Sequence, residues 1–259
     1  MRIGFAMPTY NRSALLKKRV PEYVANMDDD MALHVRDNGS TDDTWQVLES
    51  MPHERVRLDR DSVDTHVKVG FLRVLESAAK DSDYVVLMSD EDVPDWNVLP
   101  VFRDWLTEHE PVFASTQFQH GAGFHRSRVG GDIGVTESFA SSFYCSGLVY
   151  RSRDLLEVIP IVFDMLADNQ FLRIYAESGC VLALFNREGR RMWSPHYLCR
   201  QVDQLDTDIV MDDGSAYWRP DSRQVLYESF QAFCGGLLDW SGNDVFRAAK
   251  RDSLIAGWR

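Results

Sequence analysis

The sequence predicts an α/β fold in which one mainly parallel sheet is flanked by helices on both faces, followed by a helical C-terminal extension. Short apolar runs alternate with helix-length amphipathic segments through the first half of the 259-residue chain, a rhythm typical of βαβ units. The chain has no internal repeat and no low-complexity tract. After about residue 200 the pattern changes, because an acidic stretch leads into two helix-length segments. We therefore expect one sheet-based domain and a separate helical end.

The first half is expected to contain four strands with helices between them. Residues 70–80 carry apolar side chains at i, i+3 and i+4 spacing, which indicates an amphipathic helix. Residues 13–27 are expected to be helical despite Pro21. The expected strands are residues 2–7, 32–37, 55–59 and 84–88, and the expected helices are residues 13–27, 41–51 and 70–80.

The second half is less regular. Residues 120–134 hold five glycines, two histidines and two arginines, so we expect a mobile loop. The elements expected after it are a strand over 142–151, a helix over 168–178 that ends at Gly179, and a strand over 180–185. The acidic connector spans residues 202–214, and the helices of the extension are expected near 222–238 and 243–256.

Charge and cysteine content narrow the class of protein. The formal net charge is -12 and the isoelectric point is near 5.0, which argues against broad binding to nucleic acid or anionic membranes. No run approaches the ~18 apolar residues of a membrane span, and the apolar N-terminal stretch is too short for a signal peptide. The cysteines form no CxxC pair, so we expect free thiols in a reducing compartment and a cytoplasmic protein. They are Cys145, Cys180, Cys199 and Cys234.

Polar loops follow the expected strands. In sheets of this kind ligands bind outside the carboxyl ends of the strands, and those ends lead into PTYNR at residues 8–12, DNGSTDD at 37–43 and SDED at 89–92. Three consecutive carboxylates at a strand end either raise one another's pKa or require a cation. The alternative is an acidic turn in contact with solvent.

The segments MPTYNR, VRDNGSTDDT and YVVLMSDED, in this order and at strand ends, resemble the family 2 glycosyltransferases of the GT-A fold, which is Rossmann-like. The resemblance covers residues 1–95 well and is thin from 135 to 200. It implies a GT-A domain over residues 1–200, with a nucleotide-binding half at 1–95 and an acceptor-side half at 96–200. Residues 201–259 would form the helical extension.

The resemblance implies a nucleotide site at the first two strand ends. Asp37 would recognise the donor's base, because a carboxylate accepts the imide N–H of uracil or thymine or the N–H edge of guanine, whereas cytosine is disfavoured. Asn38 would belong to the same site, although residues 38–41 are also explained by a turn and a helix cap. The stretch that would line the nucleoside pocket consists of Pro8, Thr9 and Tyr10, with Arg12 near the phosphates.

The resemblance also implies Mn2+ or Mg2+ at the acidic triplet. Hard divalent cations neutralise a diphosphate and take carboxylate ligands. Asp92 would be the direct ligand, and Asp90 would bind the ribose or a metal-bound water. Glu91 would face the sugar or solvent, and His196 lies where some relatives supply a third metal ligand.

One departure concerns the helix over residues 70–80. Relatives usually carry an asparagine near its start, and Gly70 occupies that place, with His66 and Lys68 just before it. Contacts to sugar or base on that side are therefore in doubt. Lys68 would instead contact phosphate, unless it is simply an exposed lysine at the start of a helix.

An inverting transferase needs a general base for the acceptor hydroxyl. Asp168 matches the position and context of that base, although an aspartate there is also a good helix N-cap. Asp164 and Glu137 are the substitutes. The glycine-rich loop over residues 120–134 would either close over the diphosphate or be an ordinary surface loop.

The sequence thus predicts a metal-dependent glycosyltransferase that moves a hexosyl or pentosyl group from a UDP- or GDP-type sugar to an acceptor hydroxyl, with inversion. A nucleotidyltransferase would need a glycine-rich, basic triphosphate loop after the first strand, which MPTYNRS does not match. A degenerate binding module with the same fold is the other alternative. The acceptor stays open between saccharide, lipid-linked sugar, protein and a base in DNA, and so do the donor sugar and the oligomeric state.

Overall fold

The structure is a computed structural model that describes residues 1–62, 66–119, 130–134, 138, 141–142, 145–166 and 170–201, with the backbone alone for residues 66–68, 117–119, 170–171 and 201. The helices expected near 222–238 and 243–256, the connector over 202–214, and Cys234 lie outside these residues. Among the described residues, Cys145, Cys180 and Cys199 form no disulfide.

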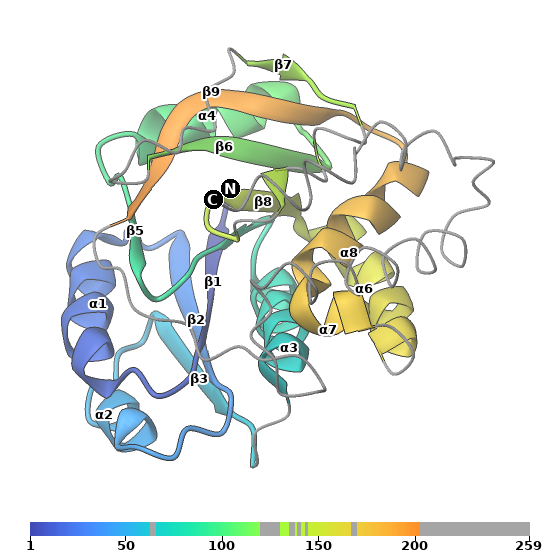
Figure 1. The fold of residues 1–259 in the computed structure, drawn as a ribbon. Coiled ribbons are helices and arrows are strands. Elements are labelled where there is room, and N and C mark those ends of the chain that lie inside the picture. The colour runs from blue at the N-terminus through green and yellow to red at the C-terminus, as the bar shows by residue number, and fades with distance from the viewer. Residues whose placement is uncertain are drawn as a thin grey trace.

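The described elements follow the expected alternation of strand and helix through the first half (Figure 1). They are β1 (Ile3–Thr9), α1 (Ser13–Asn26), β2 (Met31–Asp37), α2 (Thr44–Glu49), β3 (Val56–Arg60), α3 (His66–Asp81), β4 (Tyr84–Leu87), β5 (Asp92–Pro94), α4 (Leu99–His109), β6 (Phe113–Gln119), β7 (Gly131–Asp132), β8 (Leu148–Arg151), α6 (Ser152–Leu166), α7 (Gln170–Ile174), α8 (Ala176–Ala183), a 3-10 turn η1 (Leu184–Asn186) and β9 (Arg191–Gln201).

The strands of the described residues form one nine-stranded sheet in the order β3-β2-β1-β4-β8-β6-β9-β5, with β7 paired to β9. The first four strands are parallel. Beyond β4 the sheet is mixed, because β8 is antiparallel to both β4 and β6, while β6 and β9 are parallel. The predicted α/β fold with helices on both faces is therefore confirmed, and its parallel part is the half that carries the expected ligand edge.

The two faces of the sheet bury two separate cores, because successive strand residues point to opposite faces. Phe5 and Met7 of β1 pack with apolar side chains of α1 and α4, whereas Ala6 packs with α3, α6 and α8. All seven residues of β1 and all four of β4 are buried, as expected for central strands covered on both sides. The helices thus fix β1 and β4, whose ends lead into the expected site.

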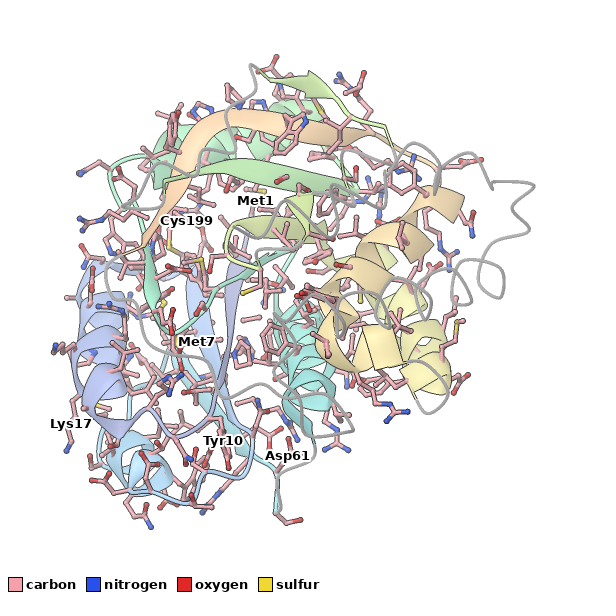
Figure 2. All side chains as sticks on the ribbon, in the orientation of Figure 1. Met1, Met7, Tyr10, Lys17, Asp61 and Cys199 are labelled. Atoms are coloured by element: carbon pink, nitrogen blue, oxygen red, sulfur yellow. The ribbon has the colours of Figure 1, made fainter. Side chains whose placement is uncertain are left out.

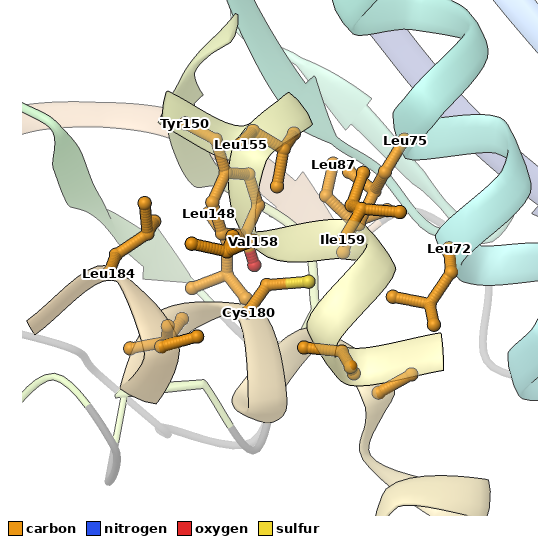
Figure 3. Close-up of a cluster of buried hydrophobic side chains, with 14 of the residues drawn as sticks. Leu72, Leu75, Leu87, Leu148, Tyr150, Leu155, Val158, Ile159, Cys180 and Leu184 are labelled. Carbon is orange, nitrogen blue, oxygen red and sulfur yellow. The ribbon is translucent and has the colours of Figure 1, made fainter. Parts of the chain in front are cut away.

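The strand predicted over residues 180–185 is wrong. These residues form the end of α8 and η1, and Cys180 and Leu184 point into the core among Leu148, Tyr150 and Val158 (Figure 3). A short run that is apolar on all sides fits a buried helix as well as a buried strand, and periodicity alone does not separate them.

The helix predicted to end at Gly179 is also different. It is divided into α7 and α8, and Gly179 lies inside α8. A Cβ at Gly179 would lie 2.7 Å from Leu172 Cδ2. Gly179 is therefore explained by the close packing of α7 against α8, and it does not mark a helix end.

Candidate active site at the carboxyl ends of the parallel strands

The carboxyl ends of β1, β2 and β3 and the turn after β4 meet at one edge of the sheet. Figure 2 shows Tyr10 and Asp61 beyond the same strand ends. Three segments with polar side chains form this edge: the β1–α1 loop, the β2–α2 loop, and the residues Asp90–Asp92, which we call the acidic turn. The expectation that these motifs gather at one edge is met for the described residues.

Thr9 joins the end of β1 to the acidic turn. Its Oγ1 donates a hydrogen bond of 2.7 Å to Asp90 Oδ2, and both side chains are buried. Burial raises the pKa of the Asp90 carboxyl, while the Thr9 hydrogen bond and the charges of Arg12 and Arg19 act in the opposite direction. Asp90 is thus a buried carboxyl group whose proton affinity depends on neighbouring donors.

Asp92 is held from the other side of the turn. It is fully buried and begins β5. Ser146 Oγ donates to Asp92 Oδ2 at 2.5 Å and accepts a hydrogen bond from the backbone N–H of Ser89 at 2.8 Å. Glu91 is only partly buried, so it is the most accessible carboxylate of the three. The sequence offered no signal for Ser146, which comes from the segment before β8.

Asp37 lies fully buried at the end of β2. Its Oδ1 accepts hydrogen bonds from the backbone N–H of Ser40 at 2.9 Å and from the Ser40 hydroxyl. Its Oδ2 forms an ion pair with Arg60 Nε at 3.2 Å. Arg60 in turn lies over the ring of Trp45, with its Cζ 5.5 Å from the ring centroid. A carboxylate has about four acceptor positions, so these contacts orient Asp37 and leave capacity for a further donor.

Asn11 joins the β1–α1 loop to the β2–α2 loop by hydrogen bonds. It adopts a left-handed backbone with φ of 53°, and its Oδ1 accepts a hydrogen bond from the Thr41 N–H at 2.9 Å. The Asn11 N–H donates to Ser40 Oγ at 2.8 Å. The residue at the N-cap position of α2 is Asp43, so Ser40 and Thr41 serve the loop contact instead of capping that helix. The cap at residues 40–41 is therefore not formed, whereas the bond from the Ser40 N–H to Asp37 Oδ1 closes a turn, and a nucleotide role for residues 38–41 stays a prediction.

The side chain of Asn38 leaves no room for a side chain at Gly70 of α3. Its backbone N–H donates to Thr9 O at 2.9 Å, and its side chain is buried. A Cβ built at Gly70 would lie 1.6 Å from Asn38 Oδ1. The carboxamide of Asn38 therefore fills the space that a side chain at position 70 would need, and the departure at Gly70 is tied to Asn38.

A buried ion-pair network follows β3, and no pattern in the sequence indicates it. Arg36 donates to both oxygens of Asp61, at 3.0 and 2.6 Å, and also pairs with Asp59. Burial disfavours the charge of Arg36, but the hydrogen bonds and charges of Asp61 and Asp59 outweigh it and raise the Arg36 pKa. Asp61 also pairs with Arg73 of α3 and donates its N–H to Asp37 O at 2.9 Å. The network holds the backbone beneath Asp37.

His196 does not lie with the acidic turn. Its ring packs edge-on against Phe102 of α4, with centroids 6.4 Å apart, and burial lowers its pKa. Asp92 pairs with Gln201, five residues further along β9, which at about 3.3 Å per residue corresponds to roughly 16 Å. The structure therefore does not bring His196 to the expected metal site.

The remaining candidates are described only in part. Lys68 lies in the first turn of α3, and its side chain is outside the described part. Asp168 and Glu137 lie outside the described residues. Asp164 is exposed on α6. The structure thus leaves the position of the general base a prediction.

The acidic turn suits a divalent cation only together with a ligand. Within the described residues no three His, Cys, Asp or Glu side chains gather around a point that could hold a metal. Mg2+ is usually held by one or two carboxylates together with phosphate oxygens, and Asp90–Asp92 offers such hard oxygen ligands. The residues therefore fit a cation that arrives with a diphosphate. Over the same described residues, no helix has the length and apolar character to cross a membrane.

Solved structures share this fold. The S. aureus TarS fragment 1–349 superimposes with a TM-score of 0.66 at 12% identity, over 100% of this chain and 70% of that chain. TarS 1–349 in complex with UDP-GlcNAc gives 0.64 at 15% identity, over 100% and 71%. The mannosyltransferase PcManGT from Pyrobaculum calidifontis, in complex with GDP-Man and Mn2+, gives 0.58 at 16% identity, over 99% and 72%.

Sequence comparison identifies the family. No curated protein matches the chain. The model of glycosyl transferase family 2 matches residues 5–156, which is more than half of the chain and includes most of β1, all of β2 to β4, the acidic turn and Ser146. With the GT-A fold that it shares with TarS and PcManGT, the chain belongs to glycosyl transferase family 2.

Proposed function

We propose that this glycosyltransferase uses a UDP- or GDP-type sugar donor and a divalent cation, Mn2+ or Mg2+, and transfers the sugar with inversion to an acceptor hydroxyl. The observation that carries the proposal is the bond from Thr9 Oγ1 to Asp90 Oδ2. It joins the β1–α1 loop to the acidic turn at the edge where Asp37 also lies, so residues for nucleoside and diphosphate share one site.

In the proposed site the nucleoside lies along the ends of β1 and β2. Asp37 accepts the imide N–H of uracil or the N–H edge of guanine, and Ser40 and Arg60 fix its orientation. Tyr10, which is partly exposed, provides apolar surface for the nucleoside. The assignments that complete this part of the site are Pro8, Thr9 and Asn38 for the nucleoside and Arg12 and Lys68 for the phosphates.

The cation is proposed to bind at the acidic turn. Asp92 and Asp90 contribute its carboxylates, and Glu91 faces the sugar or the cation from the accessible side of the turn. A bound divalent cation would neutralise the charge that develops on the leaving diphosphate. PcManGT is described in complex with GDP-Man and Mn2+, which supports a cation of this kind for the present chain. His196 is not part of the proposed cation site, because its ring packs against Phe102 of α4.

Asp168 remains our proposal for the general base, with Asp164 and Glu137 as substitutes. Residues 1–95 would bind the nucleotide, and residues 96–200 would present the acceptor. The supporting argument is chemical, since direct displacement at the anomeric carbon with inversion requires a group that takes the proton of the acceptor hydroxyl.

Nucleotide release from a panel of UDP-, GDP- and CDP-sugars, with Mn2+ or with EDTA, tests this proposal. Water serves as acceptor, so no acceptor has to be known. We expect Mn2+-dependent release from a UDP- or GDP-sugar, no release from CDP-sugars, and a sugar product of inverted configuration. Release that is equal in EDTA would contradict the metal, and a retained configuration would contradict the inversion.

The variant Asp168→Asn separates binding from chemistry. If Asp168 is the base, donor affinity is unchanged and release falls by about 10²–10⁴-fold. If Asp168 only caps a helix, release is nearly normal, because Asn and Asp cap about equally well. Nucleotide binding by the parent protein without any release would favour the degenerate binding module.

A further inference from the structure

Arg19 of α1 is a buried arginine beneath the acidic turn. Only 3% of its side chain is exposed, whereas the neighbouring Lys17 and Lys18 are exposed. Its Nε donates to Asp90 O at 3.1 Å, and one terminal nitrogen donates to Glu91 O at 3.5 Å. The other terminal nitrogen lies 3.4 Å from Glu22 Oε2, one turn along α1. A buried guanidinium costs desolvation energy, so its position calls for an explanation.

The donors of Arg19 act on the backbone of the turn. They bind the carbonyl oxygens of two consecutive residues, while the side chain of Asp90 bonds to Thr9. A guanidinium presents several N–H donors in a rigid fork, so it fixes the relative orientation of the two peptide groups in a way that one ammonium group cannot.

We propose that Arg19 is a positioning residue, which fixes the backbone of the acidic turn so that its carboxylates are held in place for a divalent cation and the donor diphosphate. This inference rests on the proposed function of the acidic turn. Arg19 contacts neither ligand in this account, and it acts through Asp90 and Glu91.

Three variants test the role. Arg19→Met keeps the length of the side chain and removes both charge and donors, while Arg19→Lys restores the charge without the fork. Arg103→Met is the matched control, because Arg103 is a partly buried arginine that donates to the backbone carbonyl of Met1 at 2.8 Å and pairs with Asp28 and Asp30, away from the turn.

The first measurement is amide hydrogen exchange over residues 88–92 in the ligand-free protein. We expect exchange at least 10-fold faster in Arg19→Met than in the parent, an intermediate rate in Arg19→Lys, and the parental rate in Arg103→Met. This measurement needs no ligand, so it decides whether Arg19 holds the turn even if the proposed function fails. Parental exchange in both Arg19 variants would overturn the inference.

The second measurement is calorimetric affinity for UDP and GDP with Mn2+ and with EDTA, well below the melting temperature of each variant. We expect Arg19→Met to lose about 10- to 100-fold of the Mn2+-dependent affinity, as is typical when a residue that orients metal ligands is removed, and to keep the affinity measured in EDTA. Arg19→Lys should recover part of the loss. A role confined to stability would lower only the melting temperature, and parental Mn2+-dependent affinity would overturn the inference.

The outcomes separate the two proposals. If the parent binds neither nucleotide in the presence of Mn2+, the proposed function fails, and the ligand role of Arg19 fails with it. If the parent binds and both Arg19 variants bind equally well, only the role of Arg19 fails. If Arg19→Met does not fold, Arg19→Lys decides, because parental exchange and affinity without the fork would contradict the positioning role.

Discussion

The packing of Gly70 against Asn38 leads to a sharp prediction for the variant Gly70→Ala. In a helix, alanine is favoured over glycine by about 1 kcal/mol, so propensity alone predicts a more stable protein. The structure predicts the opposite, because the new Cβ would lie 1.6 Å from Asn38 Oδ1 and 2.4 Å from Asn38 Cγ. The buried carboxamide has to move.

The magnitude follows from three terms. Overpacking a close-packed interior costs about 1–3 kcal/mol, and leaving polar atoms of the displaced buried carboxamide unsatisfied costs about 1–3 kcal/mol more. The propensity gain offsets about 1 kcal/mol. We therefore expect Gly70→Ala to lower the free energy of unfolding by about 1–5 kcal/mol, with nucleotide affinity reduced as well, because Asn38 adjoins Asp37.

Urea unfolding of the two single variants and of the double variant Asn38→Ala/Gly70→Ala is the assay. Once the carboxamide is absent, alanine at position 70 has room. We expect Gly70→Ala to be neutral or stabilising, by up to about 1 kcal/mol, in the Asn38→Ala background. If Gly70→Ala stabilises the parent by the amount that helix propensity predicts, the packing argument is refuted.

Three further predictions concern buried polar groups. Ser146→Ala removes a donor to the buried carboxylate of Asp92 and should cost about 1.5–3 kcal/mol in urea unfolding; a cost below about 0.5 kcal/mol would count against that hydrogen bond. Asp61→Asn breaks the bidentate pair with the buried Arg36 and should lower the free energy of unfolding in urea by about 3–5 kcal/mol. A loss as small as that of an exposed ion pair would show that the pair is open to water. Burial lowers the pKa of His34 from 6.5 to about 4, so the folded protein disfavours the protonated imidazole. The stability that the neutral ring contributes is present above pH 6.5 and is lost as the pH falls towards 4. His34→Gln should remove about 3 kcal/mol of this loss in the free energy of unfolding, and an unchanged pH profile of unfolding would contradict the prediction.

The parallel half of the fold could be predicted because each of its elements carries a local signal. Short strands with apolar residues alternate with amphipathic helices, and the strand-end rule then brings Asp37 and Asp90 to one edge. The prediction failed at residues 180–185, where burial on all sides removes the periodicity that separates helix from strand. No element was predicted at α4, α6 or β9, and the last two follow the glycine-rich segment over residues 120–134, after which the alternation of elements is less regular.

The supporting residues of the site could not be predicted, because their partners are distant in sequence. Arg19 belongs to the run KKR, whose pattern predicts three exposed cations. In the structure Arg19 is buried beneath the acidic turn, and it bonds to a residue 71 positions away. Ser146 reaches Asp92 from 54 residues further along the chain. A serine or an arginine in a helix or loop has no pattern that distinguishes a buried partner from solvent. Such contacts emerge only once β1, β4 and β8 are placed side by side.

His196 shows the reverse error. Its position in the second half of the chain matched the place of a metal ligand, but a histidine in a strand beside an amphipathic helix is also a suitable packing residue. The ring contact with Phe102 of α4 shows that packing decides its orientation. A residue's approximate place along the chain thus predicts a metal ligand less well than a carboxylate at the end of a predicted strand does.

The most direct test of the central claim is a calorimetric titration of UDP and GDP into the parent protein and into Asp92→Asn, each with Mn2+ and with EDTA. The account predicts that the parent binds one of the two nucleotides more tightly with Mn2+, and that Asp92→Asn loses this gain while keeping the metal-free affinity, because the substitution removes charge that holds the cation against the diphosphate. Equal affinities with Mn2+ and EDTA in the parent, or an unchanged Mn2+ effect in Asp92→Asn, would contradict a metal-assisted nucleotide-sugar site at the acidic turn.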